Sequence, residues 1–349
     1  MLLQEKVPLA SRTTLGVGGA ARWFAEVESE DALVEAVRFA RERDLPFFVL
    51  GGGSNLLVAD EGFPGLVAHP ALRGVTQESN RFRVAGGENW DAFVSRAVAL
   101  NFGGIECLAG IPGSVGGTPV QNVGAYGQEV SGTIELVRVL DLKDLRFVEL
   151  PAAACGFAYR ESLFNTSERG RYVVTRVDYR LEAGAAPSLR YADLQRYFRD
   201  RREAPTLAET AAAVREIRHG KGMLLVEGEA DCRSAGSFFK NPVVAQTLYD
   251  TIAAGRPTAP PFYPAHPGRV KIPAAWLLEQ AGFHKGFALG RAGISSRHTL
   301  ALVNLGGATA AEIAALRDRI VTGVEEKFGI RLEPEPVWLG PESRGPMFA

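Results

Sequence analysis

The chain has 349 residues, of which 46% are hydrophobic and 23% charged, and its 39 basic and 40 acidic side chains give a formal net charge of -1. This composition is typical of a globular protein of two or three domains, and it excludes long disordered regions and a fibrous fold. The balanced charge predicts neither a nucleic-acid-binding surface nor an acidic tail. No stretch reaches the ~18–20 uninterrupted apolar residues of a membrane-spanning helix, and we expect no signal peptide.

The first 60 residues alternate helical and strand patterns. Apolar spacing predicts a helix over residues 31–44 with Asp31 as its N-cap, followed by a short buried strand over 47–50 that ends in a glycine turn. Strand character resumes over 56–58. The local order is therefore strand, glycine turn and strand, which disfavours a Rossmann dinucleotide site, where a helix follows the glycines.

The rest of the chain predicts an α+β protein, with a smaller α/β unit that begins near residue 215. Residues 133–182 are β-rich, with strands expected over 134–140, 147–150 and 172–181. Five prolines make residues 256–267 a loop or a boundary segment. The predicted helices are 89–100, 191–202, 207–218, 274–281 and 308–328, and a last strand is predicted over 330–339.

The cysteines and histidines predict neither disulfides nor a metal site. Cys107, Cys155 and Cys232 are odd in number and widely spaced, as expected of reduced thiols in a cytoplasmic protein. The five histidines show no metal-ligand spacing. They stand at positions 69, 219, 266, 284 and 298.

Two glycine-rich stretches are candidates for binding a cofactor. In the first, GGGSN (51–55), consecutive backbone N–H groups without bulky side chains can bind a pyrophosphate, although the same sequence also forms ordinary tight turns. The second, over 110–127, is too rich in glycine for a helix or strand interior, and such a backbone often lies against a flat or phosphorylated ligand. The two together fit a dinucleotide; the alternative for the second stretch is a surface Ω-loop.

Three polar residues are candidates for chemistry. Arg160 can either bind a substrate carboxylate or form a structural ion pair with Glu161. Ser237 can cap a turn or, beside two phenylalanines in a dry pocket, donate a proton; no G-x-S-x-G motif or His–Asp pair marks it as a nucleophile. Glu335, between two prolines, is either a solvated edge residue or a rigidly aimed functional group.

These motifs together resemble the UDP-N-acetylenolpyruvoylglucosamine reductases, also called UDP-N-acetylmuramate dehydrogenases, of bacterial peptidoglycan synthesis. The resemblance covers nearly the whole chain in the family's order and is strongest for the type with an extra tyrosine loop. The motifs are LGVGG (15–19), VLGGGSNLL (49–57), GIPGSVGGTPVQNVGAYGQEV (110–130), YRESLF (159–164), GSFFKNPVV (236–244), IPAAWLLEQAGFHKG (272–286) and LEPEPVWLG (332–340).

The resemblance implies a fold, a reaction and partners. The fold would be the FAD-binding fold of vanillyl-alcohol-oxidase-like enzymes, with two α+β subdomains and a C-terminal α/β substrate-binding domain. Its parts would be 1–65 completed by 330–349, then 66–214, then 215–329. NADPH would reduce non-covalently bound FAD, whose N5 would pass hydride to C3 of the enolpyruvyl ether; protonation of C2 would give UDP-N-acetylmuramate for the cell wall, and hence for cell shape and division. We expect a cytoplasmic monomer that binds neither nucleic acid nor membrane.

The resemblance also assigns roles to residues. Arg160 and Glu335 match active-site residues at the substrate carboxylate, and Ser237 matches the proton donor to C2. Glu335 is expected to be protonated or to share a proton, because a second negative charge would repel that carboxylate. Tyr191 and Tyr263 match the tyrosines that close over the UDP diphosphate. Cofactor contacts are expected from Gly51, Gly52, Gly53, Ser54, Asn55, Pro112, Gly113, Ser114, Gly116, Gly117, Asn122, Gly124, Ala125 and Tyr159.

The nucleotide-sugar contacts that the resemblance implies are Lys221, Asn241, Lys285 and His298. Two of these depart from the usual pattern. Lys221 lies in RHGKGM rather than in a K-L-P-D-P setting, and His298 stands where a glutamine contact can occur.

Two rival hypotheses make different predictions for these residues. Another FAD-dependent alcohol oxidoreductase on the same fold predicts covalent flavin attachment, and neither Cys107 nor His69 lies in a suitable setting for it. A flavin- or nucleotide-binding module without turnover leaves Arg160, Ser237 and Glu335 unexplained.

Overall fold

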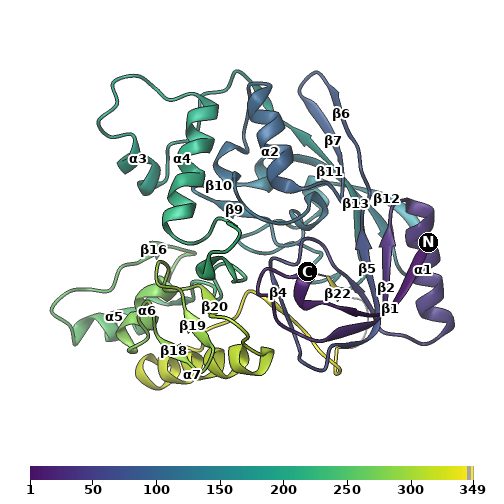
Figure 1. Ribbon diagram of the computed structural model, residues 1–349. Coiled ribbons are helices and arrows are strands. Elements are labelled where there is room, and N and C mark those ends of the chain that lie inside the picture. Colours follow the sequence, from purple (N-terminus) through teal and green to yellow (C-terminus); the bar gives the residue numbers. More distant parts are fainter. Residues whose placement is uncertain (344–346, 349) are drawn as a thin grey trace.

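The structure is a computed structural model that describes residues 1–343 and 347–348. Its first sheet has five strands in the order β1-β2-β5-β3-β22 (Figure 1). Strand β1 is antiparallel to β2, and the other neighbours are parallel. The helix α1 (Glu30–Glu42) packs on this sheet through Leu33, Ala36 and Val37. The strands are β1 (Leu2–Pro8), β2 (Ala20–Val27), β3 (Phe47–Val49), β5 (Phe63–Pro70) and β22 (Met347–Phe348).

Helix α1 starts earlier than the sequence predicted. Its N-cap is Ser29, whose side chain accepts a hydrogen bond from the backbone N–H of Ala32 at 3.1 Å. The prediction of Asp31 as the N-cap was therefore wrong. Asp31 lies in the first helical turn, where its negative charge favours the positive end of the helix dipole.

The second sheet is antiparallel and has the order β12-β11-β13-β7-β6. Helices α2 (Trp90–Ala99) and α4 (Leu207–Gly220) share an apolar core with it, in which Trp90, Phe93 and Tyr179 are buried. The strands predicted near 134, 147 and 172 are present. The five strands are β6 (Val75–Glu78), β7 (Arg81–Ala85), β11 (Ile134–Asp141), β12 (Arg146–Pro151) and β13 (Tyr172–Arg180).

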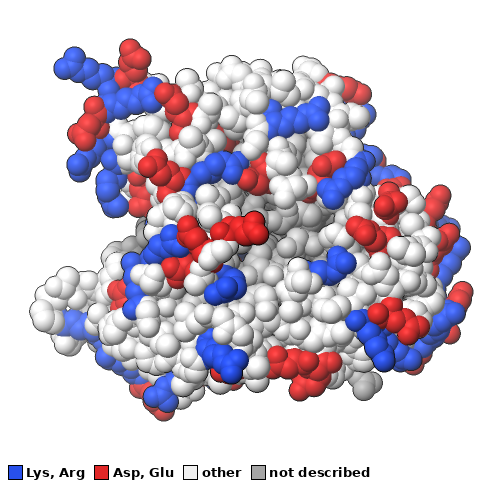
Figure 2. Space-filling view, viewed as in Figure 1, with Lys and Arg blue, Asp and Glu red and all other residues white. Residues whose placement is uncertain are grey.

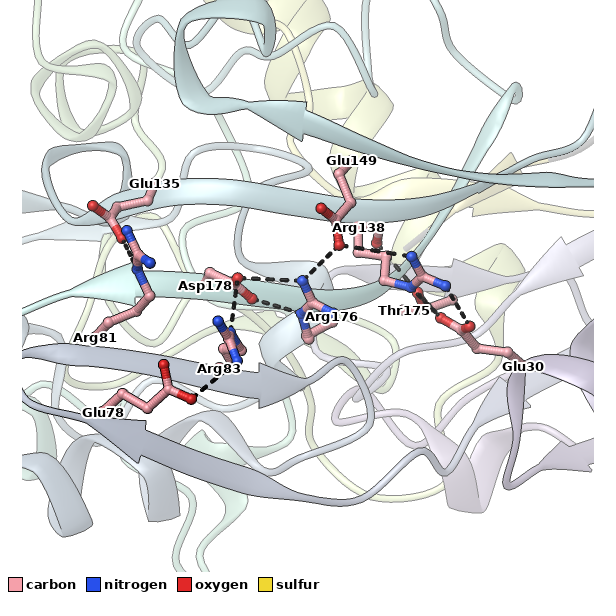
Figure 3. A network of polar contacts seen from close by, with 10 residues as sticks. All are labelled: Glu30, Glu78, Arg81, Arg83, Glu135, Arg138, Glu149, Thr175, Arg176 and Asp178. Carbon is pink, nitrogen blue, oxygen red and sulfur yellow. Dashed lines mark hydrogen bonds and ion pairs between the residues drawn. The ribbon is translucent and has the colours of Figure 1, made fainter.

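The other face of this sheet carries a network of ion pairs (Figure 3). Alternation along the strands places arginines and carboxylates on this face, opposite the apolar core. Arg138 makes two hydrogen bonds to the carboxylate of Glu30, at 2.8 and 2.9 Å, and Thr175 donates a third at 2.9 Å. Arg176 bonds to Glu149 at 2.8 Å on the same face. Because Glu30 belongs to α1, the network joins the helix of the first sheet to the strands of the second.

The third unit follows α4 and contains two small sheets with helices α5 (Gln246–Ala254), α6 (Ala274–Gln280) and α7 (Ala310–Phe328). Its core includes Phe239 and Leu277. The orders are β15-β17-β16 and β18-β19-β20. The strands are β15 (Val243–Ala245), β16 (Tyr263–Pro264), β17 (Arg269–Lys271), β18 (Ala288–Leu289), β19 (Ala292–Ile294) and β20 (Leu302–Asn304).

The first and third units are joined at the start of α7. Thr309 and Glu312 form a capping box there. Asp60, from the N-terminal part of the chain, adds a second cap: its carboxylate accepts hydrogen bonds from the backbone N–H groups of Ala310 and Ala311, at 2.7 and 2.9 Å. A helix of the third unit is thus capped by a residue that precedes it by 250 positions.

Several elements differ from the sequence prediction. Only Val337–Leu339 of the strand predicted over 330–339 is formed, as β21 paired with β4 (Leu56–Val58), since the prolines before it cannot donate to a ladder. The helix predicted over 191–202 is limited to α3 (Ala192–Tyr197), and α5 was not predicted. The short strands are β8 (Phe102–Gly103), β9 (Gly124–Ala125), β10 (Gln128–Glu129) and β14 (Glu182–Ala183), and the 3-10 helices are Ala10–Arg12, Glu106–Leu108, Val115–Gly117, Val130–Gly132, Ala152–Ala154 and Ala230–Cys232.

Two further predictions concern the C-terminal segment and membrane-spanning helices. The segment 330–349 that would complete the first subdomain includes residues 344–346 and 349, which lie outside the described residues. None of the described helices has the length and apolar content needed to cross a membrane.

The Glu30 network predicts a pH-dependent contribution to stability. The hydrogen bonds from Arg138 lower the pKa of Glu30, and the positive charge of Arg138 adds to this effect. Partial burial of Glu30 acts in the opposite direction but is the weaker influence. Its stabilisation is therefore present above about pH 4.5 and is lost as the pH falls through the lowered pKa. At pH 7 we expect Glu30→Gln to lower the free energy of unfolding in urea by about 1.5–3 kcal/mol.

The matched control is Asp31→Asn, on the same exposed helical turn. Its carboxylate makes no hydrogen bond or ion pair with the described residues, so this variant should cost less than about 1 kcal/mol. Two outcomes would contradict this role of the Glu30 carboxylate. One is an equal loss of unfolding free energy in the two variants; the other is a difference in unfolding free energy between wild type and Glu30→Gln that does not shrink as the pH is lowered.

Candidate active site

A cavity of about 1270 Å³ lies between the three units and is lined by both glycine-rich stretches. In Figure 2 the surface is hollowed between the upper and the lower part of the molecule. This volume exceeds the ~300–1,000 Å³ of a pocket for one drug-sized ligand, so it has room for a large ligand or for two together. The catalytic residues predicted from the sequence, Arg160, Ser237 and Glu335, all line it.

Glycine is present in the two stretches for different structural reasons. A Cβ on Gly52 would overlap the backbone of Gly113, and one on Gly53 would overlap the carbonyl of Arg12. These positions are glycine because two backbone segments pack directly on each other. A Cβ on Gly117, in contrast, would meet only the Ser114 hydroxyl, at 3.7 Å, and Gly117 lines the cavity. Close packing of backbone on backbone thus explains Gly52 and Gly53, whereas Gly117 faces open space in the cavity.

The first glycine turn offers open hydrogen-bond donors to the cavity. None of the hydrogen bonds among the described residues is donated by the backbone N–H groups of residues 51–54. The side chains at its end are used to hold the turn: Ser54 Oγ donates to the carbonyl of Pro112 at 3.1 Å, and Asn55 Nδ2 donates to Gln121 Oε1 at 3.1 Å. A row of free N–H groups beside a second glycine segment fits the phosphates of a dinucleotide.

Arg160 and Glu335 form an ion pair at the wall of the cavity. Nε of Arg160 lies 3.4 Å from Oε2 of Glu335, and both side chains are largely buried. Arg160 has a left-handed backbone (φ 59°), and its carbonyl accepts a hydrogen bond from Asn165 Nδ2 at 3.1 Å. The alternative pair of Arg160 with Glu161 is not among the ion pairs of the described residues.

Burial raises the pKa of Glu335. The positive charges of Arg160 and Lys240 act in the opposite direction, and Glu333 adds a smaller raising effect. Glu335 is therefore easier to protonate than an ordinary glutamate, as the sequence analysis expected. A carboxyl group in this state can donate a hydrogen bond as well as accept one.

Ser237 is held in the loop before β15 and lies against the imidazole of His298, with Oγ to Nε2 at 3.1 Å. The two phenylalanines after it, Phe238 and Phe239, are each 1% exposed and anchor the loop in the core of the third unit. The described hydrogen bonds give the Ser237 hydroxyl no backbone partner, so it is not used to cap a turn.

The segments that carry Ser237 and Glu335 are bonded to each other. The backbone N–H of Glu335 donates to the carbonyl of Phe238 at 2.9 Å, and that of Lys240 donates to Glu333 at 3.0 Å. Asn55 Nδ2, from the first glycine turn, donates to the carbonyl of Glu335 at 3.3 Å. Backbone pairing therefore brings the predicted proton donor, the buried glutamate and the first glycine turn to one place.

Two of the predicted substrate contacts, Tyr191 and Lys221, lie beside Tyr126. The ring of Tyr191 packs on that of Tyr126, with centroids 5.3 Å apart, and beside them Nζ of Lys221 lies 2.5 Å from Oδ2 of Asp193. The exposed Tyr263 lies on the proline-rich loop.

Lys271 lies near two further tyrosine rings, those of Tyr159 and Tyr263. Its ammonium group lies 4.1 Å from the ring centre of Tyr159 and 5.9 Å from that of Tyr263. Asn241, nearby, accepts a hydrogen bond from the backbone N–H of Ala274 at the start of α6.

Two predicted site residues do not line the cavity. Asn122 is buried; its amide donates to Glu129 and to the carbonyl of Ala158, and its oxygen accepts from the N–H of Ser131, so it supports the second glycine stretch from behind. Lys285 is exposed, although its charge acts on His298. The remaining predicted site residues all line the cavity.

Sequence reasoning missed several cavity residues. Arg218 of α4 is buried and donates to the carbonyls of Gly110, at 3.1 Å, and Met223, at 2.7 Å. Within a helix pattern it is indistinguishable from a solvent-facing arginine, so no local signal marks it. Glu129, Lys240 and Lys271 also line the cavity. Of these, Glu129 and Lys240 lie inside quoted motifs, which was the available signal.

Comparisons with known proteins first define the class. Residues 21–144 match the sequence profile of an FAD binding domain. With the free N–H groups and the large cavity described above, this match identifies a flavoprotein, and it confirms the predicted α+β FAD-binding fold and the FAD cofactor. Residues 228–339 match the profile of the "UDP-N-acetylenolpyruvoylglucosamine reductase, C-terminal domain".

Similar proteins then define the family. The UDP-N-acetylenolpyruvoylglucosamine reductase of Thermobifida fusca is 46% identical, over 96% of this chain and 98% of the relative, and that of Streptomyces coelicolor is 44% identical over 95% and 89%. A crystal structure of the enzyme from Thermus caldophilus matches with a TM-score of 0.67 and 29% identity, over 97% of this chain and 100% of that one. The chain belongs to the UDP-N-acetylenolpyruvoylglucosamine reductase family, which confirms the resemblance inferred from the motifs.

The Arg160–Glu335 pair makes a prediction about stability. Replacing Arg160 by Met removes the main charge that opposes the raised pKa of Glu335. Folding should then favour protonated Glu335 still more, so the variant should lose stability as the pH rises from 5 to 7.5. We expect a loss of about 2 kcal/mol relative to wild type at pH 7.5 in urea unfolding, and a smaller loss at pH 5.

The control is the double variant Arg160→Met/Glu335→Gln, which removes the buried carboxylate. It should recover most of the stability at pH 7.5 and lose the extra pH dependence. A loss in Arg160→Met that is the same at both pH values would show that the guanidinium does not act on Glu335.

Proposed function

We propose that this chain reduces the enolpyruvyl ether of UDP-N-acetylenolpyruvoylglucosamine to UDP-N-acetylmuramate, with NADPH as the reductant and FAD as the carrier. The observation that supports this most directly is the placing of Arg160, Glu335 and Ser237 on one cavity with the two glycine-rich stretches. When bound, the FAD supplies the hydride that adds to C3 of the substrate.

Arg160 and Glu335 would act on the substrate carboxylate. Addition at C3 pushes electrons toward this carboxylate, and the added charge has to be stabilised at the wall of the cavity by groups with little exposure to solvent. The guanidinium of Arg160 supplies a fixed positive charge. Glu335, when protonated, supplies a hydrogen bond to the same group instead of a repelling charge, which is consistent with the raised pKa described above.

Ser237 would complete the reaction by protonating C2. A serine hydroxyl is a weak acid, so it transfers a proton only to a strongly basic carbon held close to it. Its loop is anchored by Phe238 and Phe239 and tied to the Glu335 segment, so that donor and carboxylate-binding group keep a constant spacing.

The cofactor and the nucleotide sugar would take different parts of the cavity. We propose that residues 51–55 and 112–117 hold the FAD, and that Tyr191, Lys221 and Tyr263 bind the nucleotide sugar. The division into 1–65 with 330–349, 66–214 and 215–329, the monomeric state and the cytoplasmic location remain proposals; three free, buried cysteines support the last.

The reaction can be tested by following the flavin absorbance in two separate half-reactions. We expect reduction by NADPH and reoxidation by UDP-N-acetylenolpyruvoylglucosamine in the wild type. Ser237→Ala should leave the reduction within about twofold and slow the reoxidation by at least about a hundredfold, because only the second step needs the proton. Equal losses in the two half-reactions would give Ser237 a structural role. A yellow protein that ignores this sugar nucleotide would favour the rival alcohol oxidoreductase.

The glycine turns predict a matched pair of variants. Gly117→Ala adds a methyl group that meets only Ser114 within the protein, so it should fold normally and weaken FAD binding, measured by flavin fluorescence, by about tenfold or more. Gly52→Ala should instead destabilise the fold, since its methyl group overlaps the Gly113 backbone. Unchanged FAD affinity in Gly117→Ala would show that the cofactor lies elsewhere.

A further inference from the structure

The hydrogen bond between Ser237 and His298 has no role in the reaction as proposed so far. Oγ and Nε2 lie 3.1 Å apart, and the two residues come from different loops of the third unit. Both line the cavity. His298 was predicted as a contact to the nucleotide sugar, but in the structure its ring nitrogen contacts the hydroxyl expected to protonate the substrate.

The direction of this bond decides whether Ser237 can act as an acid. A hydroxyl group has one hydrogen to donate and can accept through its lone pairs. If His298 Nε2 accepts, the only hydrogen of Ser237 is directed at the imidazole and away from the substrate. If Nε2 carries a hydrogen and donates, the hydrogen of the serine is free to point into the cavity.

The surroundings of His298 keep the imidazole neutral. Burial, followed by the positive charges of Lys221, Lys285 and Arg218, lowers the pKa of His298 to about 4. A neutral imidazole has one N–H and one bare nitrogen, so exactly one tautomer gives Nε2 a hydrogen. The same cations lower the cost of negative charge on the neighbouring Ser237 oxygen.

The second ring nitrogen of His298 remains in contact with the cavity. Nδ1 has no hydrogen-bond partner among the described residues, and yet no buried polar side-chain atom that the structure describes lacks a partner. Nδ1 is therefore reached by solvent. The backbone N–H of His298 donates to Ser295 Oγ at 3.2 Å, which helps to hold the residue in its loop.

We propose that His298 is a positioning residue for Ser237: its Nε2–H donates to Oγ, directs the serine hydrogen toward C2 of the substrate, and restores the hydroxyl afterwards. This inference rests on the proposed function. In the proton step the O–H bond of Ser237 breaks, a C–H bond forms at C2, and the electron pair stays on Oγ. Oγ then takes the hydrogen of Nε2 while Nδ1 takes a proton from solvent, which leaves both side chains neutral. Loss of the Nδ1 proton to solvent and uptake of one at Nε2 then restore the starting tautomer, so one solvent proton is consumed per turnover.

Paired substitutions at His298 test whether its N–H donor contributes to the proton step. His298→Gln keeps an N–H donor near the position of Nε2, whereas His298→Phe keeps the size and removes the donor. In rapid mixing of the reduced enzyme with UDP-N-acetylenolpyruvoylglucosamine, we expect His298→Phe to slow flavin reoxidation at saturating substrate by about tenfold or more, the worth of one lost hydrogen bond in the transition state. His298→Gln should stay within about threefold. Reduction by NADPH should change by a similar factor in the two variants, because this half-reaction does not need the Ser237 proton.

A double variant separates positioning from substrate binding. If His298 acts through Ser237, then Ser237→Ala/His298→Phe should be no slower than Ser237→Ala alone. Losses that multiply, or a His298→Phe variant that only weakens substrate binding and keeps the maximal rate, would overturn the proposal and make His298 a substrate contact.

The tautomer can be measured without turnover. In the FAD-bound enzyme labelled with ¹⁵N-histidine, the ring nitrogen shifts should show a hydrogen on Nε2 and a bare Nδ1 at pH 7, and Ser237→Ala should shift the Nε2 signal. A hydrogen on Nδ1 would overturn the proposal. If the wild type is not reoxidised by the sugar nucleotide, the proposed function fails and the proton step with it, but these shifts still decide the direction of the bond.

Discussion

The cavity depends on one segment of backbone, residues 333–337, which is hydrogen-bonded on both sides. On one side it pairs with residues 238–240, and on the other the N–H of Val337 donates to the carbonyl of Asn55 at 2.9 Å. These bonds bring the first glycine turn, the Ser237 loop and Glu335 together, although they come from distant parts of the chain. The prolines on either side of Glu335 restrict this segment further, because their φ angles are nearly fixed.

The site concentrates charge where water is scarce, and the surrounding structure offsets the cost. Glu335 loses hydration on burial, and the charge of Arg160, 3.4 Å away, offsets only part of that loss, so the pKa of the carboxyl group is raised. Arg218, also buried, is satisfied by two carbonyl oxygens instead of a carboxylate. The neighbours of Glu335 and Arg218 therefore do not fully neutralise these two groups. This arrangement suits a site that has to bind a substrate with charges of its own.

Much of the architecture could be predicted from the sequence, because motifs and periodicity are local. The helices beginning near 89, 207 and 274 and three of the five strands of the second sheet, β11, β12 and β13, follow from apolar spacing, whereas β6 and β7 were not predicted. What local patterns could not supply were packing partners. The glycines at 52 and 53 indicated a ligand, but they are explained by the facing backbone. Asn122 stood in a cofactor motif, and its amide is used for support.

Two features of the structure could not be read from local patterns. Ser29 and Asp31 are both acceptable N-caps, and only the geometry of the first turn distinguishes them. The expected contact of His298 with the nucleotide sugar stays a prediction, whereas its contact with Ser237 arises from two loops that meet only in the folded third unit. Contacts between residues far apart in sequence leave no periodic trace.

The pairing of β21 with β4 has a consequence for how the protein is made. The partners at Asn55 and Glu335 are separated by 280 positions, so during synthesis the first glycine turn leaves the ribosome long before its neighbour exists. The nascent chain can form the second sheet and its helices, which rest on nearer contacts, but it cannot close the cofactor cavity. The complete cavity can therefore form only after the C-terminal segment has been made.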